Sequence, residues 1–307
     1  MLSFLSKRLL SAIPTLLVVI TLSFFMMRIA PGGPFDRDRA LPPEIEANIL
    51  KAYNLDKPLF EQYIDYVSNV MVLDFGPSYK FKDFTVTELI FSSFPASLQL
   101  GLMAILLAVI VGVTLGTIAA LRQNSSTDYT VMGFAMTGIA IPNFVMAPIL
   151  TLIFGVYLNW LPVGGWGNGA WENKFLPTIA LALPQIAYIS RLTRGSMVEV
   201  MHSNYIRTAR AKGLRERLVV IHHALKGAML PVVSYLGPAT AAIITGSVVI
   251  ESIFDIPGIG RYFVNAALNR DYPLVMGVVV FYGALIIMLN LIVDVIYSFL
   301  DPKLKVN

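Results

Sequence analysis

Long apolar runs alternate with short polar segments along most of this chain. The first run, Leu9 to Met27, holds 19 residues without a charge, and a helix of about 20 apolar residues crosses the roughly 30 Å hydrocarbon core of a bilayer. Further apolar runs lie at about 97–121, 129–157, 175–189, 227–250 and 273–293. The pattern predicts an all-α membrane protein with six transmembrane helices.

Two of these predicted spans are irregular. Pro142 and Pro148 fall inside 129–157, and a proline removes a backbone hydrogen bond and disturbs the preceding helical turn. We therefore expect a broken helix there, in a place where neighbouring segments satisfy the freed backbone groups. The fourth run is short for a bilayer, so we expect its helix to extend through Leu192.

The segment between the first two spans differs in kind. From Arg28 to Glu88 it carries seven Lys or Arg and ten Asp or Glu. Two stretches in it, Glu44–Tyr53 and Leu59–Met71, have the spacing of short amphipathic helices. We predict a folded external insertion between helices 1 and 2. The chain then divides into residues 1–95, the first span with this insertion, and residues 96–307, the transmembrane domain.

Composition supports the membrane assignment and narrows the function. Hydrophobic residues make up 56% of the 307 positions and charged residues 14%, whereas a soluble domain carries about 25% charged residues. The net charge of +4 comes from cations gathered in one loop between spans, which argues against nucleic acid as a partner. The chain has no cysteine, so disulfides and thiolate chemistry are excluded.

The loop that carries these cations, 191–226, holds eight Lys or Arg against two acids, while 158–174 and 251–272 hold one and two Lys or Arg. Cytoplasmic loops of membrane proteins are enriched in Lys and Arg. We therefore predict that 191–226 is cytoplasmic and that the other two loops and the insertion are external. Six spans then place both termini in the cytoplasm.

The basic loop also has a definite predicted shape. Ser203 or Asn204 can cap a helix, residues 205–212 make two turns, and Gly213 suits the left-handed residue that ends a helix. A second helical run follows, in which Leu218, Ile221, Leu225 and Met229 share a face. Such a loop is commonly only a topology signal, but a short helix with exposed cations also suits docking by a soluble partner.

The motifs of a self-sufficient pump or enzyme are missing from the sequence. There is no GxxxxGK[ST] phosphate loop and no HExxH or GxSxG motif. Adjacent His222 and His223 point to different faces of a helix, so a metal pair is not expected. Glu251 and Asp294 lie at predicted span ends, where we expect interfacial placement rather than ion coupling. Any pumping energy must then come from another chain.

Polar residues inside the predicted spans are candidates for contact with a translocated solute. Packing between helices is the alternative role for each of them. The candidates for the substrate pathway are Asn143, Gln185, Ser234, Thr240, Thr245, Ser247 and Asn290.

At YIRTARAKGL (205–214), followed by HAL (223–225) and Pro231, the chain resembles the membrane subunits of binding-protein-dependent ABC importers. More narrowly, it resembles the B-type permeases of the oligopeptide, dipeptide and nickel group. APGGP, LDFGPS and VVIESIFDIPGIG support this, and WLPVGGW and FGPSYKFKDFTV are most similar to oligopeptide permeases. The resemblance covers nearly the whole chain and implies the type I ABC importer permease fold.

In that family a cytoplasmic coupling helix with the pattern EAA-x3-G-x9-I-x-LP docks on the ATPase subunit. Ala209, Gly213 and Leu225 match this pattern, whereas Arg207 stands at its acidic position. We expect the cations of this segment to meet acidic or carbonyl groups of the ATPase. The docking residues implied by the resemblance are Tyr205, Arg207, Thr208, Ala209, Arg210, Ala211, Lys212, Gly213, Leu214 and Leu225.

The resemblance also implies the partners: a homologous second permease subunit, two ATP-binding subunits, a periplasmic substrate-binding protein and a peptide substrate, in the lipid of a bacterial inner membrane. ATP and Mg²⁺ would be bound by the partner subunits, so we expect no cofactor, metal or catalytic residue in this chain. Two alternatives remain open. The same architecture can import dipeptides, glutathione or nickel, and a stand-alone secondary carrier is the competing class.

Overall fold

The computed structural model describes residues 2–29, 51 and 54–300. Within these residues the regular structure is helical, apart from one isolated β-bridge between Pro77 and Thr85. The helix predicted at Glu44–Tyr53 falls almost wholly outside the described residues. The helix predicted at Leu59–Met71 is confirmed, because α3 has those same bounds.

Five helical segments of the described chain are long and apolar enough to cross a membrane, and a bent pair supplies a sixth. This agrees with the predicted six spans. The bent pair joins α5 (Ser126–Ala140) to α6 (Asn143–Leu150) and the π-helix η1 (Thr151–Tyr157). The other candidates are α1 (Leu2–Ile29), α4 (Val86–Leu121), α7 (Trp171–Met201), α13 (Tyr272–Leu300), and one run composed of α9 (Glu216–Leu218), the π-helix η3 (Val219–Ala224), α10 (Leu225–Gly246) and α11 (Val248–Ile253).

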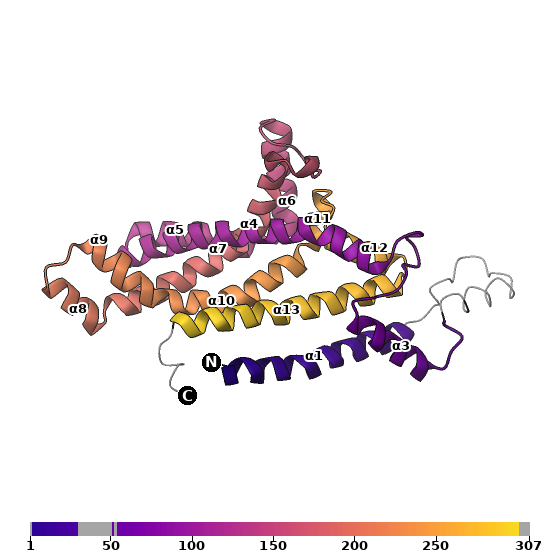
Figure 1. Ribbon diagram of the computed structural model, residues 1–307. Helices are drawn as coiled ribbons and strands as arrows, with labels where there is room; N and C mark the ends of the chain where they lie inside the picture. The colour runs from indigo at the N-terminus through magenta and orange to yellow at the C-terminus, as the bar shows by residue number, and fades with distance from the viewer. Residues whose placement is uncertain (1, 30–50, 52–53, 301–307) are drawn as a thin grey trace. The chain divides into compact units, whose positions relative to one another are not determined.

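The broken helix predicted at 129–157 is confirmed. Ile141 has extended backbone angles, because a proline disfavours the α-helical conformation in the residue directly before it. Pro142 then occupies the N-cap position of α6. The two halves meet at 105°. Figure 1 shows the consequence, with α6 standing out from the layer that contains α5 and α7.

Contacts divide the described chain into two compact units. Unit 1 contains residues 96–257 together with the end of α13 from Met288, and α7 lies at its centre, in contact with α5, α6, α10 and α11. Its core includes the fully buried Leu100, Ile189 and Phe254. The α8 helix (Asn204–Ala211) follows α7 directly, as Figure 1 shows.

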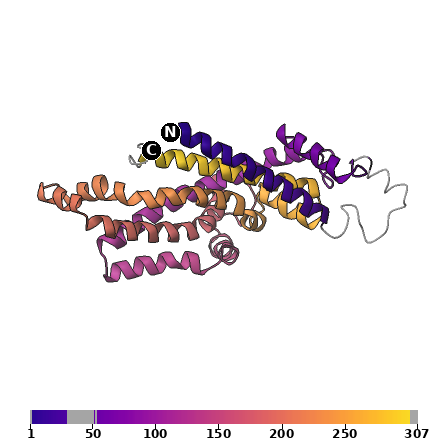
Figure 2. The same ribbon diagram turned by 90° about the horizontal axis from the view of Figure 1, so that it is seen from below.

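Unit 2 contains residues up to Pro95 and residues 258–287, so the segment 258–287 groups with the N-terminal part of the chain. Gly283 of α13 faces Val19 of α1, and the two helices run side by side in Figure 2. The buried carboxylate of Asp271, just before α13, accepts hydrogen bonds from the Ser78 hydroxyl and the Tyr79 backbone N–H. This contact fixes the LDFGPS loop to the start of α13.

Several elements are longer than the sequence predicts. The fourth span was expected at 175–189 with an extension through Leu192, but α7 runs over 31 residues, from Trp171 to Met201, with Pro177 and Pro184 inside it. The polar segment 251–272 contains an additional short helix, α12 (Ile259–Leu268), which buries Ile259 and Ala266. Both differences arise because partly polar turns are stabilised by tertiary packing that a hydropathy pattern does not record.

Candidate functional site

The α8 helix is seated on unit 1 by two inward-facing residues. Ile206 is fully buried and Ala209 is 7% exposed, and both belong to an apolar cluster with Met197 of α7 and with Val219 and Ala224 of η3. Ser203 occupies the N-cap position as the sequence predicts, although its side chain makes no capping hydrogen bond. The remaining faces of α8 are therefore free to meet another molecule.

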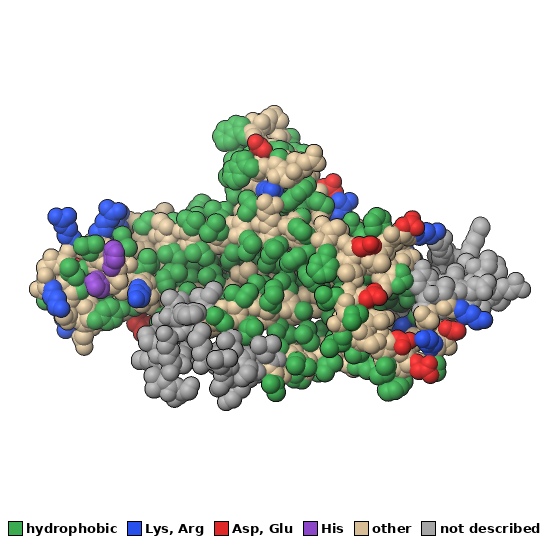
Figure 3. All heavy atoms as spheres, in the orientation of Figure 1, with side chains coloured by type: hydrophobic (Ala, Val, Ile, Leu, Met, Phe, Trp, Pro, Cys, Tyr) green, Lys and Arg blue, Asp and Glu red, His purple; other side chains and the backbone are tan. Residues whose placement is uncertain are grey.

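Most of the predicted docking residues lie on this exposed surface. Ala209 and Leu225 are the exceptions: Ala209 faces inward and Leu225 is half-buried against the same cluster. Both therefore seat the segment 204–218, which comprises α8, the Gly213 turn and α9 and is called the elbow below, rather than offer a contact. Figure 3 shows Lys, Arg and His side chains gathered over α8 and α9. The exposed members are Tyr205, Arg207, Thr208, Arg210, Ala211, Lys212, Gly213 and Leu214.

Gly213 ends α8 in the conformation that the sequence predicts. Its φ is +76°, a left-handed value that is costly for residues with a side chain. The Gly213 N–H donates to the Arg210 carbonyl at 2.9 Å, and the Leu214 N–H donates to the Ala209 carbonyl at 3.4 Å. These two bonds satisfy carbonyls at the helix end and turn the chain sharply toward α9.

A charge pair spans this turn. The Arg210 guanidinium donates to both carboxylate oxygens of Glu216, through Nε at 3.1 Å and Nη2 at 2.6 Å. The hydrogen bond from this carboxylate holds the pKa of Arg210 above its ordinary value. Sequence reasoning missed the pair, because the family pattern directed attention to the absent acid at position 207 and not to Glu216, six residues after Arg210.

The second helical run exposes the side that carries the predicted apolar face. Leu218 and Ile221 are exposed, 43% and 47%, whereas Val219, Val220, Ala224 and Ala228 are buried. The buried residues Val219, Val220 and Ala224 belong to the π-helix η3. Leu218 and Ile221 therefore join the exposed surface around the Gly213 turn.

Two of the long helices of unit 1 carry a polar contact near their middle. The Tyr235 hydroxyl of α10 donates to Gln185 Oε1 of α7 at 2.7 Å, and the rings of Tyr235 and Tyr188 lie 5.9 Å apart. Gln185 was a predicted pathway residue, whereas both tyrosines were missed. Hydrophobicity counts treat tyrosine as an apolar filler, so only the contact reveals its polar end.

Three other predicted pathway residues lie along α10 on different faces. Ser234 is exposed and Thr245 is half-buried, and both lie on the same side of α10 as the exposed Pro238. Ser234 and Thr245 are about three helical turns apart. Thr240 lies on another face, and its hydroxyl donates to the carbonyl of Leu236. The structure therefore aligns Ser234 with Thr245 and separates Thr240 from them.

The remaining pathway candidates are dispersed. Ser247 is fully buried, and its hydroxyl donates to the carboxylate of Glu251. Glu251 is itself fully buried among protein side chains, and its interfacial depth in the membrane stays a prediction. Asn143 begins α6 and Asn290 lies in α13, both half-buried.

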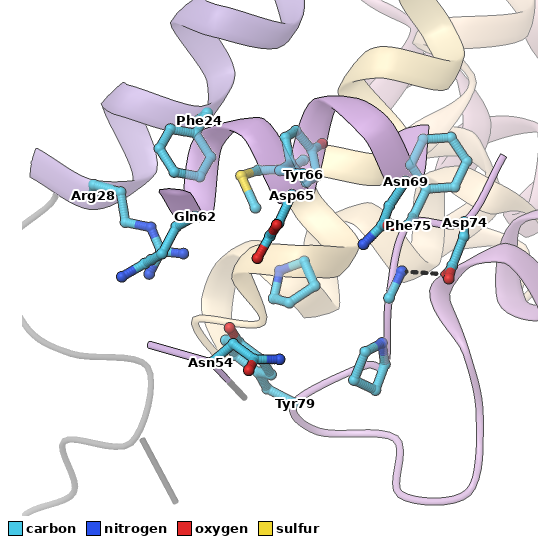
Figure 4. A pocket seen from close by; sticks show the side chains of 14 residues that line it. Phe24, Arg28, Asn54, Gln62, Asp65, Tyr66, Asn69, Asp74, Phe75 and Tyr79 are labelled. Carbon is cyan, nitrogen blue, oxygen red and sulfur yellow. Dashed lines mark hydrogen bonds between the residues drawn. The ribbon is translucent and has the colours of Figure 1, made fainter. Parts of the chain in front are cut away.

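Unit 2 contains a polar cavity of about 250 Å³ between α1, α3, the loop after α3 and the start of α13 (Figure 4). Arg28 packs over the ring of Phe24 at 5.2 Å, and Asp65 is held by Lys57 at 2.7 Å. Buried Gln62 Oε1 has no hydrogen-bond partner among the described residues. The cavity is thus lined by cationic, anionic and neutral polar side chains. Its described lining holds no nucleophile with a base beside it.

The described residues contain no group of three or more His, Asp or Glu side chains placed to hold a metal ion. This concerns only residues 2–29, 51 and 54–300. The geometry of unit 1 is that of a helical assembly with a polar contact at its middle and a cationic elbow at one end.

Comparison with known proteins identifies this architecture. The family described as "Binding-protein-dependent transport system inner membrane component" matches residues 112–306, and its N-terminal companion family matches residues 1–101. A crystal structure of an amino acid ABC transporter, with 16% identity, has a TM-score of 0.51 over 69% of this chain and 94% of that chain. The solved structure supports the type I permease fold alone.

Relatives over the full length are closer in sequence. The oligopeptide transport system permease protein OppB of Salmonella typhimurium is 58% identical over 99% of this chain and 100% of its own length. The dipeptide transport system permease protein DppB of Bacillus subtilis is 45% identical over 98% of this chain and 97% of its own. This chain belongs to the binding-protein-dependent transport system inner membrane components, the multi-pass permease subunits of ABC transporters.

Proposed function

We propose that this chain is the pore-forming permease subunit of an ATP-driven oligopeptide importer. Full-length similarity is higher to oligopeptide permeases, at 58%, than to a dipeptide permease, at 45%. The single observation that carries the mechanism is α8, a short helix seated by Ile206 and Ala209 with its cationic side exposed directly after α7. A partner that moves α8 moves the end of a central helix of unit 1.

The partners follow from the family. A homologous second permease subunit completes the pathway, two ATP-binding subunits grip the elbow from the cytoplasm, and a periplasmic substrate-binding protein delivers the peptide. ATP and Mg²⁺ are bound by the ATP-binding subunits, and this chain contributes no catalytic residue. Both termini lie in the cytoplasm of the bacterial inner membrane, and 191–226 lies on the same side.

The docking contacts are proposed to be formed by the exposed elbow residues. Arg207 and Lys212 have no ion-pair partner within the described residues, so their charges are available to acids or carbonyls of the ATP-binding subunit. Arg210 is already held by Glu216 and therefore presents a fixed guanidinium. Gln185, Tyr235, Ser234 and Thr245 are the proposed contacts for cargo, because the structure gives them a shared polar contact or an open face.

Reconstitution tests this proposal. The complex of all subunits in proteoliposomes, supplied with binding protein, should accumulate a labelled oligopeptide only when ATP is present on the side of the ATP-binding subunits. The isolated chain should hydrolyse no ATP. Accumulation driven by an ion gradient without ATP-binding subunits would establish a secondary carrier instead, and uptake restricted to dipeptides, glutathione or nickel would replace the cargo assignment.

A further inference from the structure

Lys174 is a buried cation in the first turn of α7. It is 6% exposed, yet the described residues place no carboxylate within ion-pair distance of its ammonium. Its one defined contact is the ring of Trp166, whose centroid lies 4.8 Å from Nζ. Lysine side chains are seldom this buried without an anionic or hydrogen-bonding partner, and within the described residues Lys174 has the indole ring in that place.

The loop before α7 forms a rigid cover over this side chain. Gly167, Asn168 and Gly169 have φ values of +52°, +53° and +84°, a left-handed turn that glycine makes possible at two of the three positions. Asn173 Nδ2 donates to the carbonyls of Gly164 and Gly165 at 3.0 and 3.2 Å. The loop is therefore tied to the first turn of α7 and has a defined shape.

Two N–H donors lie close to Gly169. A side-chain carbon built on Gly169 would lie 3.6 Å from Lys174 Nζ and 3.7 Å from Trp166 Nε1. Within the described chain neither donor has a hydrogen-bond acceptor. A charged donor and a neutral donor within contact distance of one position form the donor set that a carboxylate accepts.

The place of this pair along α7 indicates where the anion comes from. Gln185 follows Lys174 by eleven residues, about three turns, and so lies on the same face of the helix. That face carries the contact of Gln185 with Tyr235. A group as deeply covered as Lys174 is reached by the end of a flexible chain and not by the surface of a folded partner.

We infer that Lys174 Nζ and Trp166 Nε1 form a carboxylate site beside Gly169, and that its ligand is the C-terminal carboxylate of the peptide cargo. This inference rests on the proposed function, because it requires a peptide to enter along the α7 face. It deepens that function by assigning the recognition of a free C-terminus to this chain.

The test compares one peptide in two forms, with a free C-terminus and with a C-terminal amide, in the full complex in proteoliposomes. Lys174→Met keeps the length of the side chain and removes the charge, and Lys82→Met removes a charge from an exposed external loop as the matched control. The ratio of free-acid to amide uptake should fall at least fivefold in Lys174→Met, remain near wild type in Lys174→Arg, and stay unchanged in Lys82→Met. Selectivity of the binding protein cancels because the same binding protein serves every variant.

A second measurement does not depend on how the variant folds. A wild-type complex is illuminated with a peptide whose last residue is photo-leucine, and mass spectrometry should locate cross-links within 164–174. An unchanged ratio with no cross-link there would overturn the carboxylate site, and equal loss of both peptide forms would assign the anion to a partner protein. Failure of the wild-type complex to import either peptide would instead reject the proposed function.

Discussion

Arg194 of α7 donates two hydrogen bonds of 2.6 Å to the two carboxylate oxygens of Asp128 at the start of α5. Asp128 is almost fully buried, with 2% of its side chain exposed, whereas Arg194 is 30% exposed. The Asn124 N–H also donates to this carboxylate at 2.9 Å, and the Ser125 hydroxyl oxygen accepts from the Asp128 N–H at 3.4 Å. The pair therefore ties two helices that are 66 residues apart in the chain.

Asp128→Asn should destabilise the protein by about 2 kcal/mol, because it leaves a partly buried guanidinium without its charge partner. The figure is below that of a fully buried pair since water reaches Arg194. Thermal unfolding of the purified complex in detergent measures the change. Lys57→Gln, which breaks an exposed pair with Asp65, is the matched control and should cost less than about 1 kcal/mol. Equal midpoints for both variants would contradict this role of Asp128.

Gly213→Val should abolish ATP-dependent peptide uptake while leaving membrane insertion intact. The space around Gly213 is open, so the defect would come from the left-handed backbone angle, which a β-branched residue adopts only at a cost. Uptake in proteoliposomes and the amount of chain in the membrane are measured together. Gly133→Ala, at an equally open glycine inside α5, should retain uptake. Normal uptake by Gly213→Val would count against docking at the elbow.

Arg210→Ala should weaken coupling to the ATP-binding subunit and leave the stability of the chain nearly unchanged. The pair with Glu216 is about half exposed on both sides, and such pairs contribute about 0.2–1 kcal/mol. The unfolding midpoint should therefore change little, while ATPase activity stimulated by loaded binding protein should fall several-fold. A large loss of stability with unaltered stimulation would show that Arg210 acts only within its own loop.

Cysteine labelling can test the open face of α10, and the natural chain has no cysteine to interfere. Ser234→Cys and Thr245→Cys should both react with a small water-soluble reagent, and peptide cargo should slow both reactions. Thr240→Cys, which faces elsewhere, should react slowly with or without cargo. Equal rates at all three positions would remove the basis for this pathway face.

The same method tests the orientation of the chain. Lys82→Cys, in the loop after α3, should react with a membrane-impermeant reagent added outside intact cells or spheroplasts. Lys212→Cys, at the end of α8, should react only after the membrane is opened. The opposite pattern would invert the proposed topology and place the elbow where no cytoplasmic ATPase reaches it.

Hydropathy and helix-ending residues predicted much of the fold. The span at 129–157 was expected to break, and it bends after Ile141 because Pro142 follows. Gly213 was expected to be left-handed, and it is. These features are local, and each depends on the backbone of one or two residues.

The remaining features depend on contacts that no local pattern contains. The π-helix η3 was not predicted, and its Val219 and Ala224 pack in the same cluster as Ile206 and Ala209 of α8. Burial of Glu251 is likewise a tertiary result. The docking and pathway residues remain predictions, because a single chain holds neither the ATP-binding subunit nor the cargo.

Gly116 of α4 lies so near α7 that an added side-chain carbon would stand 2.5 Å from the Ser190 carbonyl oxygen, and Gly138 of α5 approaches Leu183 of α7 in the same way. Backbones in such contact have no side chains between them that can slide or change rotamer. Helices α4, α5 and α7 should therefore move together as one rigid body. A displacement of α8 by its partner would then be transmitted along the whole group of three helices. The backbone that bends must lie in the segments that connect this group to the rest of the chain.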